Sequence, residues 1–149
     1  MFESLKSLEV TDKTSWCDLP EIGPKARVLV LHAGESNRPY FNAILRRYGK
    51  QKAQPKNRTL TPAVMAEARA ADKEMFAQYV IMGWEGIPGK NGFVPFQREL
   101  AVEFLDSIPD WMFDRIRNHA ADVQNFIGEI ELPDAEELSG NSESGSVTN

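Results

Sequence analysis

Apolar residues recur at helical spacing over residues 61–82, and this longest periodic segment constrains the fold more than any other feature of the sequence. Thr61 and Pro62 form a strong helix start, because threonine caps helix N-termini and proline fits the first helical turn. The apolar side consists of Val64, Met65, Ala68, Met75, Phe76, Tyr79 and Val80. The spacing therefore predicts a long amphipathic helix over 61–82.

Three shorter segments have the same helical spacing. Residues 37–49 begin with Asn-Arg-Pro and end at Gly49, a start and a stop that are typical of helices. Residues 97–107 form the second segment. The third, residues 109–128, begins with Pro-Asp and is stopped by a glycine. Together with the first segment, they predict about four helices.

The N-terminal part of the chain contains the best strand. Ala26–His32 is rich in valine and leucine, and Pro24 and Gly34 lie on either side of it. This composition and these neighbours favour a strand over a short buried helix. Its only nearby candidate partner is a short edge strand at Ser15–Cys17, because the prolines around that segment exclude a regular central strand.

A glycine-rich segment separates the second and third predicted helices. Residues 83–95 contain four glycines and two prolines, which exclude a helix there. Pro88-Gly89 and Asn91-Gly92 are turn dipeptides. We therefore expect a small hairpin or an ordered loop, with Trp84, Ile87, Phe93 and Val94 as its apolar anchors.

The C-terminal residues 129–149 are acidic and rich in serine, glycine and asparagine. Such a composition buries too little apolar surface to offset chain entropy, so we expect a disordered tail. The sequence as a whole predicts a mainly α fold: about four helices, a minor N-terminal β element and the acidic tail. The expected division is a β-containing segment at 1–36 packed on a helical domain at 37–128, followed by the tail.

Composition limits the function classes. With Cys17 as its only cysteine, the chain forms no internal disulfide and no cysteine-based zinc site. The N-terminus does not read as a signal peptide, and no apolar run is long enough to span a bilayer. We therefore expect a protein of a reducing cytoplasm without a membrane partner. The net charge of −5 argues against general nucleic-acid binding.

No constellation of residues predicts catalysis, a cofactor or a metal. Gly89-Lys90 lacks the spacing and the preceding strand of a phosphate-binding loop. Nothing in the sequence places His32 or His119 beside Cys17 as a general base. Asp110, Asp114 and Asp122 are weighed as acid/base or metal carboxylates, but the position of Asp110 and Asp114 at a helix start, where the helix dipole favours anions, explains them adequately. We therefore expect a non-enzyme with no catalytic, cofactor-binding or metal-binding residue.

Two features are candidates for binding other molecules. The basic segment 46–58 is free of acids, and it is read as a solvated loop, a nucleic-acid contact, or a dock for an acidic partner or the acidic tail. The second feature is a set of apolar residues around the glycine-rich segment. Such residues form either a core edge or a protein-binding surface. The predicted binding residues are Trp84, Ile87, Phe93, Phe96 and Trp111.

Three stretches in a fixed order carry a resemblance. They read Tyr79-Val80-Ile81-Met82-Gly83-Trp84-Glu85-Gly86-Ile87, Phe93-Val94-Pro95-Phe96-Gln97-Arg98-Glu99 and Pro109-Asp110-Trp111-Met112-Phe113-Asp114-Arg115-Ile116. In order and spacing they resemble the tail assembly chaperones of long-tailed, siphovirus-type bacteriophages. The strand at 27–32 and the helix start after it also fit, so the resemblance covers most of the chain outside the tail. Gln97 departs from the family's serine and Leu100 from its asparagine; because glutamine is a poor N-cap, that helix start is expected to be built differently.

The resemblance implies a role. Such chaperones bind the helical tape-measure protein and keep it soluble until the tail tube assembles around it. They act in the host cytoplasm and are not expected in the mature virion. The tail tube protein and a frameshifted longer form of the chain are further partners that the resemblance implies. The alternatives are a nucleic-acid-binding regulator that uses residues 46–58 and a minor virion tail component.

Overall fold

The computed structural model describes residues 1–52, 59–130 and 132. The chain forms two compact units, one of residues 1–9 with 127–149 and one of residues 10–126. The predicted acidic tail lies almost wholly outside the described residues, as do Lys56 and Arg58 of the predicted basic segment. The predicted division into 1–36, 37–128 and 129–149 stays a prediction.

The smaller unit contains a short 3-10 helix, η1 (Glu3–Leu8). Its apolar residues Phe2, Leu5 and Leu8 are exposed, and they recur at the three-residue spacing that places side chains on one face of a 3-10 helix. Within the same unit, the backbone N–H of Gly128 donates to the Ser7 carbonyl at 2.8 Å.

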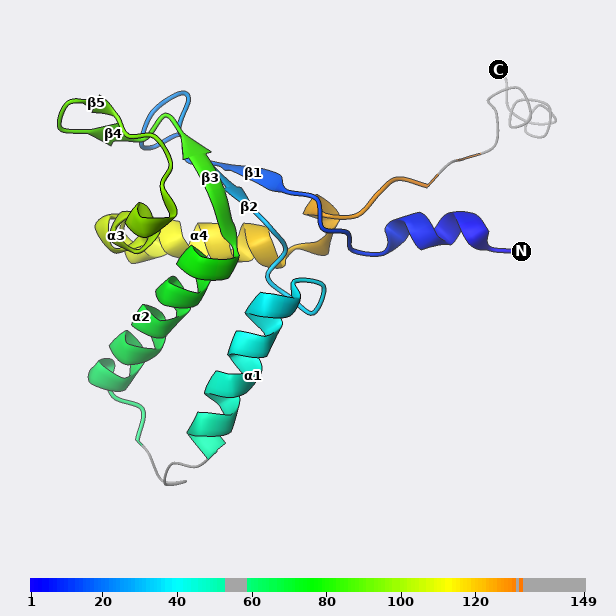
Figure 1. The fold of residues 1–149 in the computed structure, drawn as a ribbon, viewed down its shortest axis with the longest axis horizontal. Helices are drawn as coiled ribbons and strands as arrows, with labels where there is room; N and C mark the ends of the chain where they lie inside the picture. The colour runs from blue at the N-terminus through cyan, green and yellow to red at the C-terminus, as the bar shows by residue number, and fades with distance from the viewer. Residues whose placement is uncertain (53–58, 131, 133–149) are drawn as a thin grey trace, which may run out of the picture. The chain divides into compact units, whose positions relative to one another are not determined.

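The larger unit contains an antiparallel sheet of three strands in the order β1 (Ser15–Asp18), β2 (Arg27–Val30) and β3 (Ile81–Glu85) (Figure 1). The predicted pair of N-terminal strands is confirmed, with Cys17 opposite Val28. On its other side β2 pairs with β3, with an irregularity between Leu29 and Val30. The sequence did not predict this third strand.

The prediction of a mainly α fold of about four helices is therefore wrong. Antiparallel strands form the three-stranded sheet and a separate hairpin, β4 (Pro88–Gly89) with β5 (Gly92–Phe93), beside the helices. The predicted helix over 61–82 ends at Tyr79, and the chain continues directly into β3 (Figure 1). The apolar side chains of Val80, Ile81 and Met82 continue the helical spacing, and for this reason the sequence pattern extends the predicted helix too far.

The two long helices are α1 (Arg38–Lys52) and α2 (Pro62–Tyr79). The predicted start of α2 is confirmed: the Thr61 hydroxyl accepts a hydrogen bond from the Val64 N–H at 3.2 Å. At the start of α1, the Asn37 side chain accepts from the Tyr40 N–H and donates to the Tyr79 carbonyl. Gly49 does not end α1, so the first part of the predicted basic loop is helical.

The remaining helices are shorter than predicted. A 3-10 turn, η2 (Arg98–Leu100), leads into α3 (Ala101–Ser107). Gln97 provides no side-chain cap, in agreement with the expectation from its type. The last helix, α4 (Asp110–Ala121), ends before the predicted Gly128 and is followed by η3 (Val123–Asn125).

The core lies between the inner face of the sheet and the helices (Figure 1). Its largest fully buried side chains are Leu19, Val28, Val30, Val80, Ile81, Leu105, Ile116, Phe113 and Phe126. The Phe76 ring of α2 meets the Phe113 ring of α4 edge-on, with centroids 5.6 Å apart. No helix within the described residues is both long enough and apolar enough to cross a membrane.

Candidate protein-binding surfaces

Two of the predicted binding residues belong to the core. Trp84 and Ile87 are only 7% and 8% exposed. The Trp84 indole N–H donates to the Val94 carbonyl at 2.8 Å, and its ring lies 4.8 Å from the ring of Phe96 and 5.0 Å from that of Phe104, centroid to centroid. Phe96 is half-buried against this core. Trp84, Ile87 and Phe96 therefore pack the glycine-rich segment against the domain.

The other two predicted residues are exposed. Phe93 of β5 is 71% exposed and Trp111 of α4 is 51% exposed. The Arg115 guanidinium carbon lies 5.3 Å from the centroid of the Trp111 ring, a cation–π arrangement that partly covers it. The structure thus divides the predicted set into two exposed residues and three that pack against the core, and partner binding by any of them stays a prediction.

A more extensive surface lies between the long helices. A groove of about 630 Å³ runs between α1, α2 and the start of α3. Its apolar lining consists of Ala43, Ala71, Met75, Ala77, Tyr79 and Val102, and its polar lining consists of Arg46, Arg47, Lys50, Glu74, Gln78, Arg98 and Glu99. The sequence indicated the basic residues but not the groove, because its second wall comes from helices more than 20 residues further along the chain.

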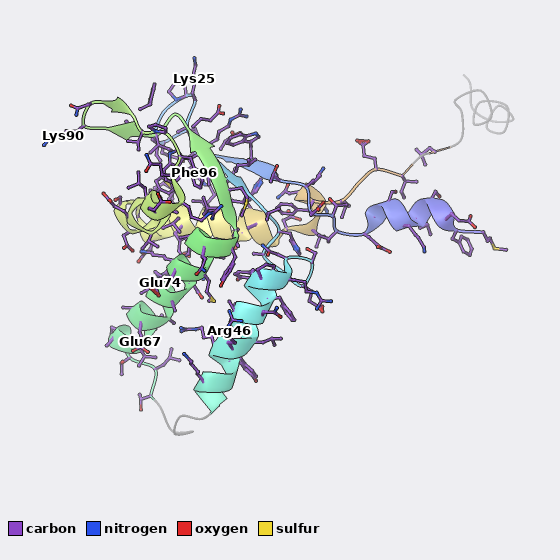
Figure 2. All side chains as sticks on the ribbon, in the orientation of Figure 1. Lys25, Arg46, Glu67, Glu74, Lys90 and Phe96 are labelled. Atoms are coloured by element: carbon purple, nitrogen blue, oxygen red, sulfur yellow. The ribbon has the colours of Figure 1, made fainter. Side chains whose placement is uncertain are left out.

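Apart from Arg98, which lies beside Glu99 on η2, the charged residues of the groove are separated by side. Arg46, Arg47 and Lys50 come from α1, whereas Glu74 comes from α2 and Glu99 from η2. Figure 2 labels Arg46 on α1 and Glu74 on α2. An opening with an apolar lining and walls of opposite charge fits a partner that is apolar along one side and charged along its flanks.

Asp110 and Asp114, which the sequence predicts at a helix start, lie in the first two turns of α4 and form ion pairs. Arg69 of α2 contacts Asp114 at 2.9 Å and Asp110 at 3.6 Å. Asp114 also accepts from Arg117. Hydrogen bonds from Arg117 and then Arg69 lower the pKa of Asp114, so this carboxylate is stabilised as an anion that joins α2 to α4.

The cysteine and the histidines do not form a catalytic pair. Within the described part of the chain, Cys17 has no hydrogen bond to a histidine. His119 Nε2 lies 2.9 Å from the Ser15 hydroxyl, and His32 Nδ1 lies 3.0 Å from the Ser36 hydroxyl. Burial lowers the pKa of His119 and raises that of the Cys17 thiol. The described residues also contain no group of three or more His, Cys, Asp or Glu side chains able to hold a metal ion.

The fold and its surfaces define a small mixed α and β domain with one large open groove. Its origin is shown by a family match: residues 35–136 match the family described as YdaY prophage protein. The chain belongs to this family and is therefore a phage-derived protein. No curated protein and no solved structure matches it. The matched residues include all four α-helices and therefore both walls of the groove.

Proposed function

We propose that this chain is a phage tail assembly chaperone, a non-catalytic protein that binds the tape-measure protein in the host cytoplasm and is absent from the mature virion. The observation that carries the proposal is the groove between α1 and α2. A tape-measure protein is long and helical, and before the tail tube covers it, its apolar stripes face water. A groove that takes up such a stripe would keep the protein soluble.

The composition of the groove supports helix binding. Ala71 is small and half-buried, so a partner backbone could approach it closely, while the half-buried Met75 supplies an adaptable apolar surface. Recognition of an amphipathic helix in an apolar groove is a common binding mode. Membership of a prophage family and the order of the three sequence stretches given above support the same role.

The polar residues of the groove favour binding over catalysis. Among the described residues, no serine, cysteine, histidine or aspartate lines it. These residue types supply most nucleophiles and general bases. Apart from Arg98, which lies beside Glu99 on η2, the basic residues of the groove come from α1 and the glutamates come from the opposite wall, an arrangement suited to orienting a partner.

The test is co-expression with the tape-measure protein of the same phage, followed by pull-down and measurement of the soluble fraction. We expect the wild-type chain to co-purify with the tape-measure protein and to raise its soluble fraction. Ala71→Trp, which fills the groove, should abolish both effects. Ala66→Trp is the matched control, because Ala66 is an exposed alanine of the same helix that does not line the groove.

Two outcomes would overturn the proposal. The first is aggregation of the tape-measure protein with no complex, both with this chain and with a longer form that carries the frameshifted extension. The second is recovery of the chain in stoichiometric amounts from purified phage particles, which would indicate a minor tail component instead. Retained binding by Ala71→Trp would place the contact outside the groove, and loss of binding in both tryptophan variants would show that the effect is not specific to the groove.

A further inference from the structure

The basic side of the α1–α2 groove indicates what kind of helix it takes. We propose that the groove receives an amphipathic helix with an acidic flank, and that this flank lies along Arg46, Arg47 and Lys50 of α1. This inference rests on the proposed function in one respect, since it assigns a charge pattern to the tape-measure segment that binds. The preference of the groove for an acidic amphipathic helix is tested without the tape-measure protein.

The first observation is the absence of internal compensation on α1. The helix contains no aspartate or glutamate over its whole length. Arg46 and Lys50 are exposed and Arg47 is half-buried. Among the described residues, none of these three side chains takes part in an ion pair. Their charge is therefore available to a partner.

The cations of α2 and α4 behave differently. Arg69, Lys73 and Arg117 each contact one or more aspartates, at N–O distances of 2.5 to 3.8 Å. Arg115 forms a two-point contact with Glu21. Among the described residues, most buried and half-buried cations are neutralised internally, whereas Arg46, Arg47 and Lys50 of α1 form no ion pair, which is the arrangement expected for a contact with an acidic partner.

The second wall selects against a nucleic acid. Glu74 and Glu99 face the same groove, and their charges would repel a phosphate backbone held by α1. Arg98 lines the same wall and keeps its positive charge, but its Nη1 donors are taken up by the carbonyls of Ala77, Gln78 and Ile81. With two glutamates and one arginine, this wall carries a net negative charge. A helix whose acids lie on one flank can place them along the basic wall and keep them away from the acidic wall. A polyanion would be attracted by the basic wall and repelled by the acidic wall.

The lining between the walls accepts an apolar stripe. Ala43 is buried, Ala71 and Met75 are half-buried, and Val102 is 37% exposed. These side chains are short or flexible, so leucine-sized residues of an incoming helix have room between α1 and α2. The groove volume of about 630 Å³ is large enough for several such side chains.

The test uses designed peptides as probes. The first is a helical peptide of about 20 residues with a leucine stripe, glutamates on one flank and glutamines on the other. The second has lysines in place of the glutamates. Binding of each fluorescent peptide to the full chain is followed by anisotropy at about 50 mM and about 300 mM NaCl. We expect the acidic peptide to bind at least about tenfold more tightly, with weaker binding at high salt.

Charge-reversal variants locate the contact. Arg46→Glu with Arg47→Glu should lower affinity for the acidic peptide by about tenfold or more. Lys25→Glu with Lys90→Glu makes the same change in net charge at exposed sites, and Figure 2 shows both lysines at the opposite end of the domain from Arg46. This control pair should change affinity by less than about twofold. Circular dichroism melting verifies that each variant is folded.

Three results would overturn the inference: no binding of the acidic peptide, equal binding of both peptides, or equal losses in the two variant pairs. A different outcome would assign the basic side to nucleic acid instead. In that case the chain binds single- or double-stranded DNA but not the acidic peptide, and reversal of Arg46 and Arg47 abolishes the DNA binding.

The two proposals fail separately. If the reversed variant still solubilises the tape-measure protein, the chaperone role stands and the charge assignment falls. If the acidic peptide binds but the wild-type chain fails to solubilise the tape-measure protein, the charge assignment stands and the chaperone role falls.

Discussion

At the scale of single residues, the side chain of Arg98 caps the C-terminal end of α2 by hydrogen bonding to its last carbonyls. Its Nη1 donates to the carbonyls of Ala77 and Ile81 at 2.9 Å and of Gln78 at 3.2 Å. The last carbonyls of a helix have no partner within the helix, and a cation beside them also interacts favourably with the helix dipole. Arg98 therefore fixes the point at which α2 gives way to β3.

Arg98→Met should destabilise the domain by about 1–2 kcal/mol, because it removes these donors and keeps a side chain of similar length. The measurement is the free energy of unfolding in urea, followed by tryptophan fluorescence. Lys90→Met at the exposed hairpin turn is the control and should change the free energy by less than about 0.5 kcal/mol. Equal effects of the two substitutions would mean that Arg98 is not needed to close α2.

A second residue-scale prediction concerns Cys17. Burial raises the pKa of its thiol from 9.0 to about 11, although nearby Arg115 acts in the opposite direction. The thiolate is the reactive form, so the native thiol should resist a disulfide reagent at about pH 8 and react once urea unfolds the chain. Rapid labelling of the native protein would contradict the buried position.

The same shift predicts a dependence of stability on pH. Between pH 9.0 and about 11 the unfolded chain has lost the Cys17 proton while the native chain still holds it. Unfolding then releases a proton, so stability falls as pH rises through this window. Cys17→Ala should reduce that fall, as measured by urea unfolding at a series of pH values.

At the scale of elements, the turn after β3 depends on one glycine. Gly86 has φ of +71°, and a Cβ there would lie 2.4 Å from the Lys25 carbonyl oxygen. The chain thus passes close to the segment that precedes β2, where a side chain cannot fit. This contact sets the end of β3 relative to β2.

Gly86→Ala should cost at least about 2 kcal/mol, because it adds both backbone strain and a clash with backbone atoms. Gly23→Ala is the matched control: no atom lies within 4 Å of the position its Cβ would take, and its φ is not positive. That substitution should change the free energy of unfolding by less than about 1 kcal/mol. If both alanines are tolerated equally, the close approach at Lys25 is not as tight as the structure shows.

The same elements show what the sequence could predict. The Thr61-Pro62 start and the strand pair around Cys17 depend on local signals, namely a cap, an N1 proline and short-range β propensity. The strand Ile81–Glu85 could not be recognised in this way. It contains a glycine, it follows α2 without a turn signal, and its partner β2 lies about 50 residues earlier in the chain. The mainly α prediction failed at that strand.

The predicted binding residues show the same limit. Trp84 and Phe93 belong to one short segment, yet Trp84 is buried and Phe93 exposed. Residue type alone did not separate core from surface, because aromatic side chains are common in both. The groove between α1 and α2 could not be predicted either, because it depends on how two helices and η2 meet in space.

At the scale of the whole molecule, carboxylates held by arginines tie distant parts of the larger unit together. Glu21, in the connection between β1 and β2, pairs with Arg115 of α4. Asp114 of α4 pairs with Arg69 of α2. These contacts join the sheet connection, the longest helix and the last helix, so protonation of the carboxylates should weaken the entire domain.

The sign of this effect follows from the pKa values. Hydrogen bonds from Arg115 lower the pKa of Glu21 from 4.5 to about 2, and those from Arg117 and Arg69 lower the pKa of Asp114 below 3.8. The unfolded chain therefore binds protons more readily than the native chain, and the stability present above pH 4.5 is lost as pH falls toward 2. The exposed Glu21 pair should be the more sensitive of the two to added salt.

Glu21→Gln combined with Asp114→Asn should lower the free energy of unfolding at neutral pH. The pair should also flatten the acid limb, that is, reduce the further fall of this free energy as pH is lowered, because neither side chain can then change its charge. Urea unfolding at pH values between about 2 and about 7 measures the slope directly. Glu99→Gln with Glu103→Gln is the control, since both carboxylates are exposed and form no ion pair within the described residues. If the control pair flattens the limb as much as the paired carboxylates do, acid sensitivity arises from overall charge. If only the first pair does so, the arginine contacts between elements determine how the domain responds to acid.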